Sequence, residues 1–181
     1  MTVLSSRLGD PIDDLVRRAA AGDEAAFTRI VDAHHDDMVR VSFVVCGDAD
    51  LAEEAVATAW LIAWRKLRDL REPGRLRPWL VSIAANEARQ SIRRRKRHGV
   101  IELAMPDVAV PSNDPGARAT DIDLANALAR LDPDDRALLA LRYVAGFDST
   151  ELARATGRSA SGTRARLARL LDRLRMELRD D

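Results

Sequence analysis

The stretch WLVSIAANEARQSIRRRKR, residues 79–97, predicts a helix with two different halves. In the first half the apolar residues Leu80, Ala84 and Ala88 recur at helical spacing, so one face is expected to be buried. The second half ends in consecutive cations at residues 93–97. Such a helix suits a polyanion, because each cation can displace a counterion from phosphate. The alternative is a solvated basic helix end, since the helix macrodipole favours cations at a C-terminus.

The formal net charge of zero hides a strong segregation of charge along the chain. Residues 1–64 carry 5 basic and 12 acidic groups, whereas residues 65–97 carry 12 basic and 3 acidic groups. Residues 98–153 return to 4 basic and 10 acidic groups, and residues 154–175 hold 7 basic groups and 1 acidic group. Two separate basic blocks indicate a protein that meets a polyanion at two places.

Composition restricts the compartment and the chemistry. The 181 residues suffice for one ordinary domain or two small ones, and the low aromatic content of 4% favours helices over sheet. We expect a cytoplasmic protein without membrane insertion, since neither a secretory signal nor a run of about 20 apolar residues is evident. The single cysteine, Cys46, excludes an internal disulfide and argues against a cysteine-type zinc site. We expect it to be buried and inert.

The first 97 residues predict a compact helical domain over residues 11–97. Asp23 is expected to cap a helix that Cys46 and Gly47 close, and the next helix covers LAEEAVATAWLIAWRKL at 51–67. Trp60 and Trp64 on that helix could stack on exposed bases, but their spacing of four favours packing in a core stripe. The proline-rich segment LREPGRLRP at 70–78 predicts a basic loop beside the basic helix, the geometry of a nucleic-acid cleft.

The remainder predicts a linker and a second small domain. Residues 98–120 hold three prolines and no sustained period, so we expect a flexible linker there. Residues 121–178 predict short amphipathic helices, one of them running to Gly146, followed by STELARAT, a turn at Gly157 and a basic helix capped by Ser159. Short helix, glycine turn and longer basic helix form a helix-turn-helix, whose second helix enters the major groove. The predicted fold class is therefore all-α, with two small helical domains.

The order of these parts resembles one bacterial family. The chain from about Asp13 to Arg175 is similar to sigma factors of the sigma-70 family, extracytoplasmic-function (ECF) group, which keep only regions 2 and 4 joined by a linker. The resemblance rests on five segments in this order: GDEAAF (22–27), LAEEAVATAWLIAWRKL (51–67), WLVSIAANEARQSIRRRKR (79–97), LARLDPDDRALLALRYVAGFDSTELA (128–153) and GRSASGTRARLARLLDRLR (157–175).

The resemblance implies a non-enzymatic initiation factor that binds core RNA polymerase and promoter DNA, needs no cofactor and is controlled by an anti-sigma factor. Region 2 would dock on the polymerase clamp and would melt and read the −10 element, capturing an unstacked base. Region 4 would read the −35 element. The implied polymerase contacts are Glu53, Glu54 and Arg65; the implied −10 contacts are Arg71, Arg75, Arg77, Asn86, Arg89, Gln90 and Arg93; the implied −35 contacts are Ser161, Arg164, Arg166 and Arg169.

Two places depart from the family pattern. Ala57 and Thr58 replace a usual glutamine and acidic residue, which leaves Glu53 and Glu54 with more of the docking. Gly162 and Thr163 stand where the family usually has threonine and valine, so we expect a looser start and a weaker core contact in the recognition helix.

Other functional classes fit the sequence less well. No Ser-His-Asp set, phosphate-binding glycine loop or metal-ligand spacing is evident, which argues against an enzyme, and the three histidines do not make a metal site. A helix-turn-helix repressor or activator acting without core polymerase would explain the second basic block but not the first. A purely structural adaptor would explain neither block.

Overall fold

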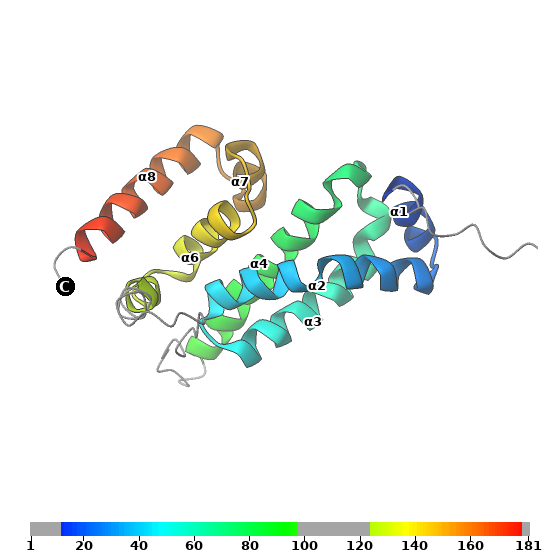
Figure 1. Cartoon of the computed structure of the whole chain (residues 1–181), viewed down its shortest axis with the longest axis horizontal. Coiled ribbons are helices and arrows are strands. Elements are labelled where there is room, and N and C mark those ends of the chain that lie inside the picture. Colours follow the sequence, from blue (N-terminus) through cyan, green and yellow to red (C-terminus); the bar gives the residue numbers. More distant parts are fainter. Residues whose placement is uncertain (1–11, 98–123, 179–181) are drawn as a thin grey trace, which may run out of the picture.

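The structure, a computed structural model, describes residues 12–97 and 124–178, and these residues form helices joined by turns (Figure 1). The predicted tail before residue 12 and the whole predicted linker at 98–120 lie outside the described residues. The N-terminal part consists of α1 (Ile12–Ala20), α2 (Glu24–Cys46), α3 (Ala49–Lys66), the 3-10 turns η1 (Leu67–Asp69) and η2 (Pro73–Arg75), and α4 (Leu76–Arg97). The C-terminal part consists of a helical segment at 124–129, α6 (Pro133–Leu139), the turn η3 (Ala140–Val144), α7 (Ser149–Thr156) and α8 (Ala160–Glu177). The all-α prediction is confirmed.

Side chains cap the starts of several helices, and the cap predicted at Asp23 is confirmed. Asp23 accepts a hydrogen bond from the Ala26 N–H at 3.0 Å, and Asp48 accepts one from the Leu51 N–H at 2.9 Å. Asp148 and Glu151 complete a reciprocal capping box at the start of α7. Each cap satisfies backbone donors that have no partner inside the helix. Asp132 occupies the N-cap position of α6, but its side chain makes no capping hydrogen bond.

Helix α4 begins earlier than the proline pattern predicted. It starts at Leu76, so Pro78 lies in its first turn and Arg77 lies on a helix rather than in the loop. Proline is tolerated there because N–H groups of the first turn have no intrahelical acceptor. This earlier start fixes the direction of Arg77, a predicted −10 contact, relative to the rest of α4.

The helix predicted to run to Gly146 is also not uniform. After α6 the chain continues through η3, a π-helical turn in which the Ala145 N–H donates to the Ala140 carbonyl at 3.0 Å. Gly146 then adopts a left-handed conformation, with φ of 76°, as predicted. The wider turn leaves Tyr143 and Val144 exposed while Ala145 and Phe147 are buried.

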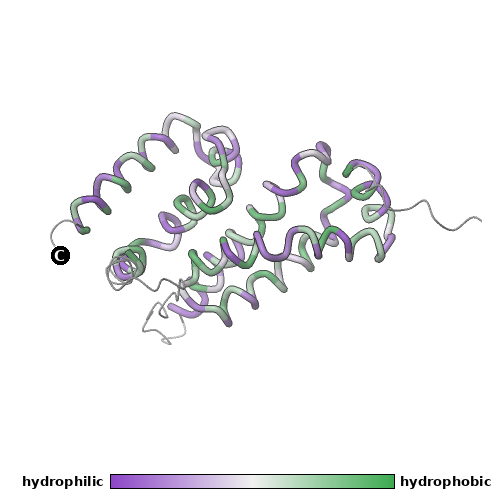
Figure 2. Tube along the Cα trace, in the orientation of Figure 1, coloured by the Kyte–Doolittle hydropathy of each residue, from purple (hydrophilic) through white to green (hydrophobic). Residues whose placement is uncertain are grey.

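The core of the N-terminal part lies between α2, α3 and α4, which pack side by side (Figure 1). Figure 2 shows hydrophobic and hydrophilic residues interleaved along these helices, which is typical of helices buried on one face. The prediction of Trp60 and Trp64 as core was only partly right: Trp60 is half-buried and Trp64 is 38% exposed. Both rings contact Phe27 in a T-shaped arrangement. Most of the buried residues of α3 are alanines, which let the helices approach closely.

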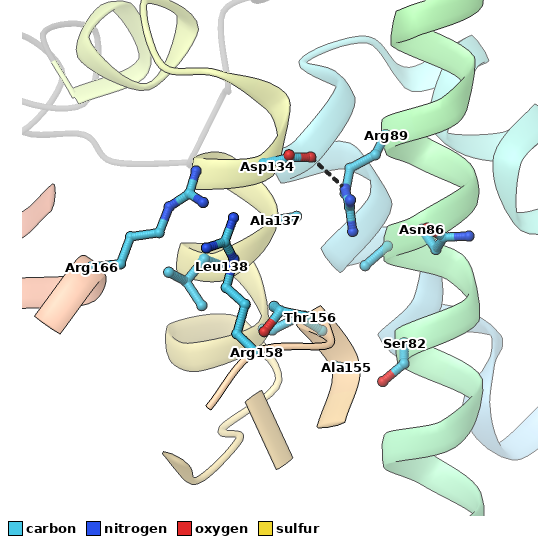
Figure 3. A pocket seen from close by; sticks show the side chains of 12 residues that line it. Ser82, Asn86, Arg89, Asp134, Ala137, Leu138, Ala155, Thr156, Arg158 and Arg166 are labelled. Carbon is cyan, nitrogen blue, oxygen red and sulfur yellow. Dashed lines mark hydrogen bonds and ion pairs between the residues drawn. The ribbon is translucent and has the colours of Figure 1, made fainter. Parts of the chain in front are cut away.

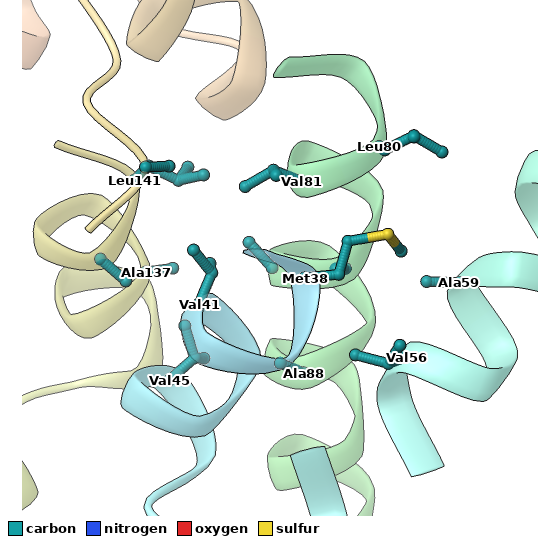
Figure 4. Close-up of a cluster of buried hydrophobic side chains, with 14 of the residues drawn as sticks. Met38, Val41, Val45, Val56, Ala59, Leu80, Val81, Ala88, Ala137 and Leu141 are labelled. Carbon is teal, nitrogen blue, oxygen red and sulfur yellow. The ribbon is translucent and has the colours of Figure 1, made fainter. Parts of the chain in front are cut away.

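The two parts share one continuous core. Ala137 and Leu141, from the C-terminal part, face Val41 and Val45 on α2 and Val81 on α4 (Figure 4). Helix α6 lies between α4 and the pair α7–α8, with its N-terminal end near the basic end of α4 (Figure 1). The structure therefore holds the two predicted domains in a closed arrangement, a placement that the sequence did not predict.

Candidate nucleic-acid interface

The basic end of α4 forms an open groove. Among the described residues, its lining includes Gln90, Arg93, Arg94, Lys96 and Arg97. The opposite face of α4 is held in the core by Leu80, Ala84, Ala88 and Ile92, so the groove side is presented outward. An array of cations on a rigid helix is suited to the phosphates of a nucleic acid.

A hydrogen bond and an ion pair fix the orientation of side chains around this surface. The buried carboxylate of Glu87 accepts a hydrogen bond from the Gln90 amide at 3.0 Å. Arg95 turns away from the groove and pairs with Asp48 at 2.9 Å. The pKa of Asp48 is held below its usual value, mainly by the hydrogen bond from the Leu51 N–H and further by Arg95. Arg95 thus ties α4 to the start of α3.

The predicted −10 residues differ in their surroundings. Asn86 and Arg71 are exposed, and Arg75 pairs with Glu72 at 2.7 Å. Arg77 bridges two elements, because it bonds to Asp37 at 2.7 Å and donates to the carbonyl of Ala145 at 2.9 Å. The structure therefore places Arg77 in contact with both α2 and the C-terminal part.

Arg89 and Arg93 meet a carboxylate from the other part of the chain. Asp134 accepts a hydrogen bond from Arg89 at 2.7 Å (Figure 3). It also accepts two from Arg93, at 2.8 and 2.9 Å. A cavity of about 60 Å³ beside this cluster is lined by Asn86 on α4 and by residues of α6, α7 and α8. The face of α4 predicted to read the −10 element is thus partly covered by α6. The sequence did not predict a role for Asp134.

The predicted polymerase contacts lie on the outer face of α3. Glu53, Glu54 and Arg65 are all exposed, and the Glu53 carboxylate lies 3.9 Å from the His35 imidazole. The same face carries Leu61, which is 60% exposed and lies one helical turn from Arg65. A single exposed leucine is common on protein surfaces, so Leu61 is a candidate contact because of its position beside Arg65 and not because of its exposure. Sequence reasoning missed Leu61 because it lies in an apolar run that resembles core.

The helix-turn-helix has the expected local geometry. Gly157 takes a left-handed conformation, with φ of 65°, between α7 and α8, and the Ser159 hydroxyl caps α8 by accepting from the Gly162 N–H at 3.1 Å. Thr163 is buried, and its hydroxyl donates to the Ser159 carbonyl at 2.9 Å. The polar atom at this core position is therefore satisfied.

The predicted −35 residues also divide into two groups. Ser161, Arg164 and Arg169 are exposed on α8. Arg166 is instead half-buried and bonds to Asp135 on α6 at 2.5 Å. Predicted readers of both promoter elements, Arg89 and Arg93 for −10 and Arg166 for −35, are therefore paired with acidic residues of α6.

Burial shifts the pKa of two other titratable groups. Cys46 is fully buried, and burial raises its pKa to about 12, as expected of an inert thiol. Burial lowers the pKa of His34, so its neutral form is favoured in the folded state.

Among residues 12–97 and 124–178 no group of three His, Cys, Asp or Glu side chains is placed to hold a metal ion. In the same residues no helix is long and apolar enough to cross a membrane.

Comparison with known families identifies both parts. Residues 30–98 match sigma-70 region 2, and residues 121–174 match sigma-70 region 4. The RNA polymerase sigma factor NccH of Alcaligenes xylosoxydans xylosoxydans is 32% identical over 170 residues, which cover 88% of this chain and 91% of NccH. The ECF RNA polymerase sigma factor SigM of Mycobacterium tuberculosis is 30% identical over 166 residues, which cover 87% of this chain and 83% of SigM. The chain belongs to the sigma-70 family, ECF group.

Other relatives differ in length, and solved structures share the fold. The probable RNA polymerase sigma factor RfaY of Xanthomonas campestris pv. campestris is 31% identical over 168 residues, which cover 88% of this chain but only 42% of RfaY. The structure of CnrH, in complex with the cytosolic domain of CnrY, matches with a TM-score of 0.70 at 24% identity over 95% of this chain and 99% of CnrH. The sigma factor RpoE of Bartonella quintana, in complex with the anti-sigma factor NepR, matches with a TM-score of 0.69 at 24% identity over 86% of this chain and 98% of RpoE.

Proposed function

We propose that this chain binds core RNA polymerase and directs it to specific promoters. The observation that carries the proposal is the match of two family regions to the two parts of the chain, each of which bears a basic helix. A repressor acting without core polymerase would leave the conserved region 2 match and the basic groove of α4 without a role. Family membership therefore favours an initiation factor over that alternative. No enzymatic step is assigned to the chain.

The two domains take separate promoter elements in this proposal. The region 2 domain, residues 11–97, reads the −10 element through the seven residues named for it in the sequence, from Arg71 to Arg93. A linker at 98–120 connects it to the region 4 domain, residues 121–178, which reads the −35 element through Ser161, Arg164, Arg166 and Arg169. Exposure of Asn86, Arg164 and Arg169 supports these assignments, because base contacts require accessible side chains.

Polymerase docking is assigned to the outer face of α3. Glu53, Glu54 and Arg65 supply charge, and the exposed Leu61 adds an apolar contact among them. Protein interfaces commonly have an apolar centre and a polar rim, so Leu61 would lie at the centre of this contact and the charged residues at its rim. The apolar contact would replace part of what Ala57 and Thr58 do not supply.

An anti-sigma factor is the proposed regulator, and the cytoplasm, where bacterial transcription takes place, is the proposed compartment. CnrH and RpoE, which share this fold, are both described in complexes, RpoE with an anti-sigma factor. Co-purification of the chain from cells in which it is silent would recover such an inhibitor. A chain that is constitutively active, with no inhibitor recovered, would contradict this part of the proposal.

The docking assignment predicts a large loss of polymerase affinity. The Glu53→Ala/Glu54→Ala variant is expected to bind core polymerase about tenfold more weakly, which corresponds to about 1.4 kcal/mol. The measurement is fluorescence anisotropy of the labelled chain titrated with core polymerase. The matched control is Asp32→Ala/Asp36→Ala, which removes two exposed acidic residues from α2. Equal affinity for the α3 variant and the wild type would reject the docking face.

A further inference from the structure

The first turn of α8 contains a chain of polar contacts that ends on a predicted −35 contact. The Ser159 hydroxyl oxygen accepts a hydrogen bond from the Gly162 N–H at 3.1 Å and lies 3.3 Å from the hydroxyl oxygen of Ser161. Ser159 is the N-cap of the helix, and Ser161 is exposed. The capping hydroxyl is therefore in contact with the side chain that is expected to face the promoter.

The remaining hydroxyl of this turn is committed to the fold. Thr163 is buried, and both its backbone N–H and its hydroxyl donate to the Ser159 carbonyl, each at 2.9 Å. These two bonds hold the backbone of Ser159 at the start of the helix. Ser159 and Ser161 are thus the hydroxyl groups of the first turn that can take part in recognition.

The helix N-terminus gives this pair of hydroxyls a direction. The N–H groups of a first turn carry partial positive charge, so the Ser159 oxygen faces Gly162 and its hydrogen points away. Hydrogen bonds that run in one direction polarise and strengthen each other. The favoured arrangement is therefore donation from Gly162 to Ser159 and from Ser159 to Ser161. It leaves the Ser161 hydrogen available to an acceptor outside the protein.

The arrangement depends on the absence of a side chain at position 162. A Cβ atom there would lie 3.0 Å from the Ser159 hydroxyl oxygen, which is closer than ordinary van der Waals contact. Any other residue would thus displace the hydroxyl from its present position. Glycine lowers helix propensity relative to alanine. Gly162 therefore makes room for the capping hydroxyl at a cost to the helix itself.

We infer that Ser159 and Gly162 are positioning residues for promoter recognition, which hold the Ser161 hydroxyl as a hydrogen-bond donor toward the major groove. The inference rests on the proposed −35 role of α8. In the major groove guanine, adenine and thymine each present an acceptor, whereas the cytosine edge presents only an amino donor. The Ser161 donor therefore discriminates against cytosine at the base that it faces.

The test is transcription by core polymerase and the full chain from a promoter whose −35 element is randomised. The promoter is taken from the genomic fragments that the wild-type chain transcribes, and a second library randomises its −10 element. Sequencing of the transcribed templates gives the base preferences. The wild-type chain is expected to select against cytosine at one −35 position by about tenfold. Ser161→Ala should reduce this factor to about twofold or less.

Two variants address the positioning residues. Gly162→Ala displaces the capping hydroxyl, and Ser159→Asp keeps a cap that can only accept, so that Ser161 must donate inward. Both should also reduce the discrimination against cytosine to about twofold or less, with unchanged −10 preferences. The midpoint of urea unfolding should not fall, because alanine favours the helix and aspartate caps as well as serine. The matched control is Ser159→Thr, which keeps a capping hydroxyl and should keep the wild-type preference.

The outcomes separate the inference from the proposed function. Unchanged discrimination in Gly162→Ala and Ser159→Asp would overturn the inference and leave the −35 role of α8 intact. Loss of discrimination in Ser159→Thr, or a lower unfolding midpoint with equal relaxation at every −35 position, would overturn it as well. Absence of any −35 preference in the wild-type chain would instead contradict the proposed role of α8.

Discussion

Neutralising the groove of α4 is expected to reduce the salt dependence of single-strand DNA binding. In the Arg94→Gln/Lys96→Gln/Arg97→Gln variant, the slope of log K against log salt should fall in magnitude by about 2, since each phosphate contact on a single strand contributes about 0.7. These residues line the groove but take no part in the contact with Asp134. The expected change therefore reports DNA contact rather than domain opening.

The measurement is a salt titration of fluorescence anisotropy with a labelled 20-nucleotide single strand of mixed sequence. A control with the same loss of three positive charges is Arg17→Gln/Arg40→Gln/Lys66→Gln, at exposed positions on α1, α2 and α3. The control should retain the wild-type slope, because its residues lie outside the groove. Equal slopes for the groove variant and the wild type would show that the basic end of α4 is only a solvated helix terminus.

Removing the buried charge of α6 is expected to stabilise the protein. Arg136→Met should raise the free energy of unfolding by about 1–4 kcal/mol, the range seen when buried ionic groups are replaced by apolar residues of similar volume. The reason is that the guanidinium is fully buried and no partner for it is found in the part of the chain that the structure describes. Methionine can fill most of the same space with a flexible apolar chain.

Urea unfolding followed by circular dichroism gives the required free energies. Arg130→Met, at an exposed position before α6, is the control and should change stability by less than about 0.5 kcal/mol. Destabilisation of the Arg136 variant would contradict the account, because it would mean that the folded chain satisfies this charge.

Local features of the fold could be predicted from the sequence because they depend on neighbouring residues. The caps at Asp23, Asp48 and Ser159 each need only a side-chain oxygen and an N–H three residues later. Gly146 and Gly157 mark left-handed turns for an equally local reason, the absence of a Cβ.

Features that depend on tertiary packing could not be predicted in the same way. Whether Pro78 precedes a helix or lies in its first turn depends on what the preceding residues pack against, and Leu76 is buried. The π-turn after α6 and the exposure of Trp64 likewise depend on distant contacts. Local sequence patterns do not encode those contacts.

In the candidate site, too, some residues could be predicted from the local sequence and others only from tertiary packing. Residues that function by charge, such as Arg89 and Arg93, stood out because cations cluster along the chain near them. Their partner Asp134 lies 41 residues beyond Arg93 and could be found only from the packing of α6 on α4. Leu61 was missed because exposure of one apolar residue within a helical run depends on the tertiary structure.

The most direct test of the central claim is run-off transcription with purified bacterial core polymerase across a pool of genomic promoter fragments. Adding the wild-type chain should produce a defined set of transcripts that core polymerase alone does not make, and the Glu53→Ala/Glu54→Ala variant should lose them. Absence of transcripts, together with tight duplex binding by the full chain without polymerase, would contradict a sigma factor and identify a conventional helix-turn-helix regulator.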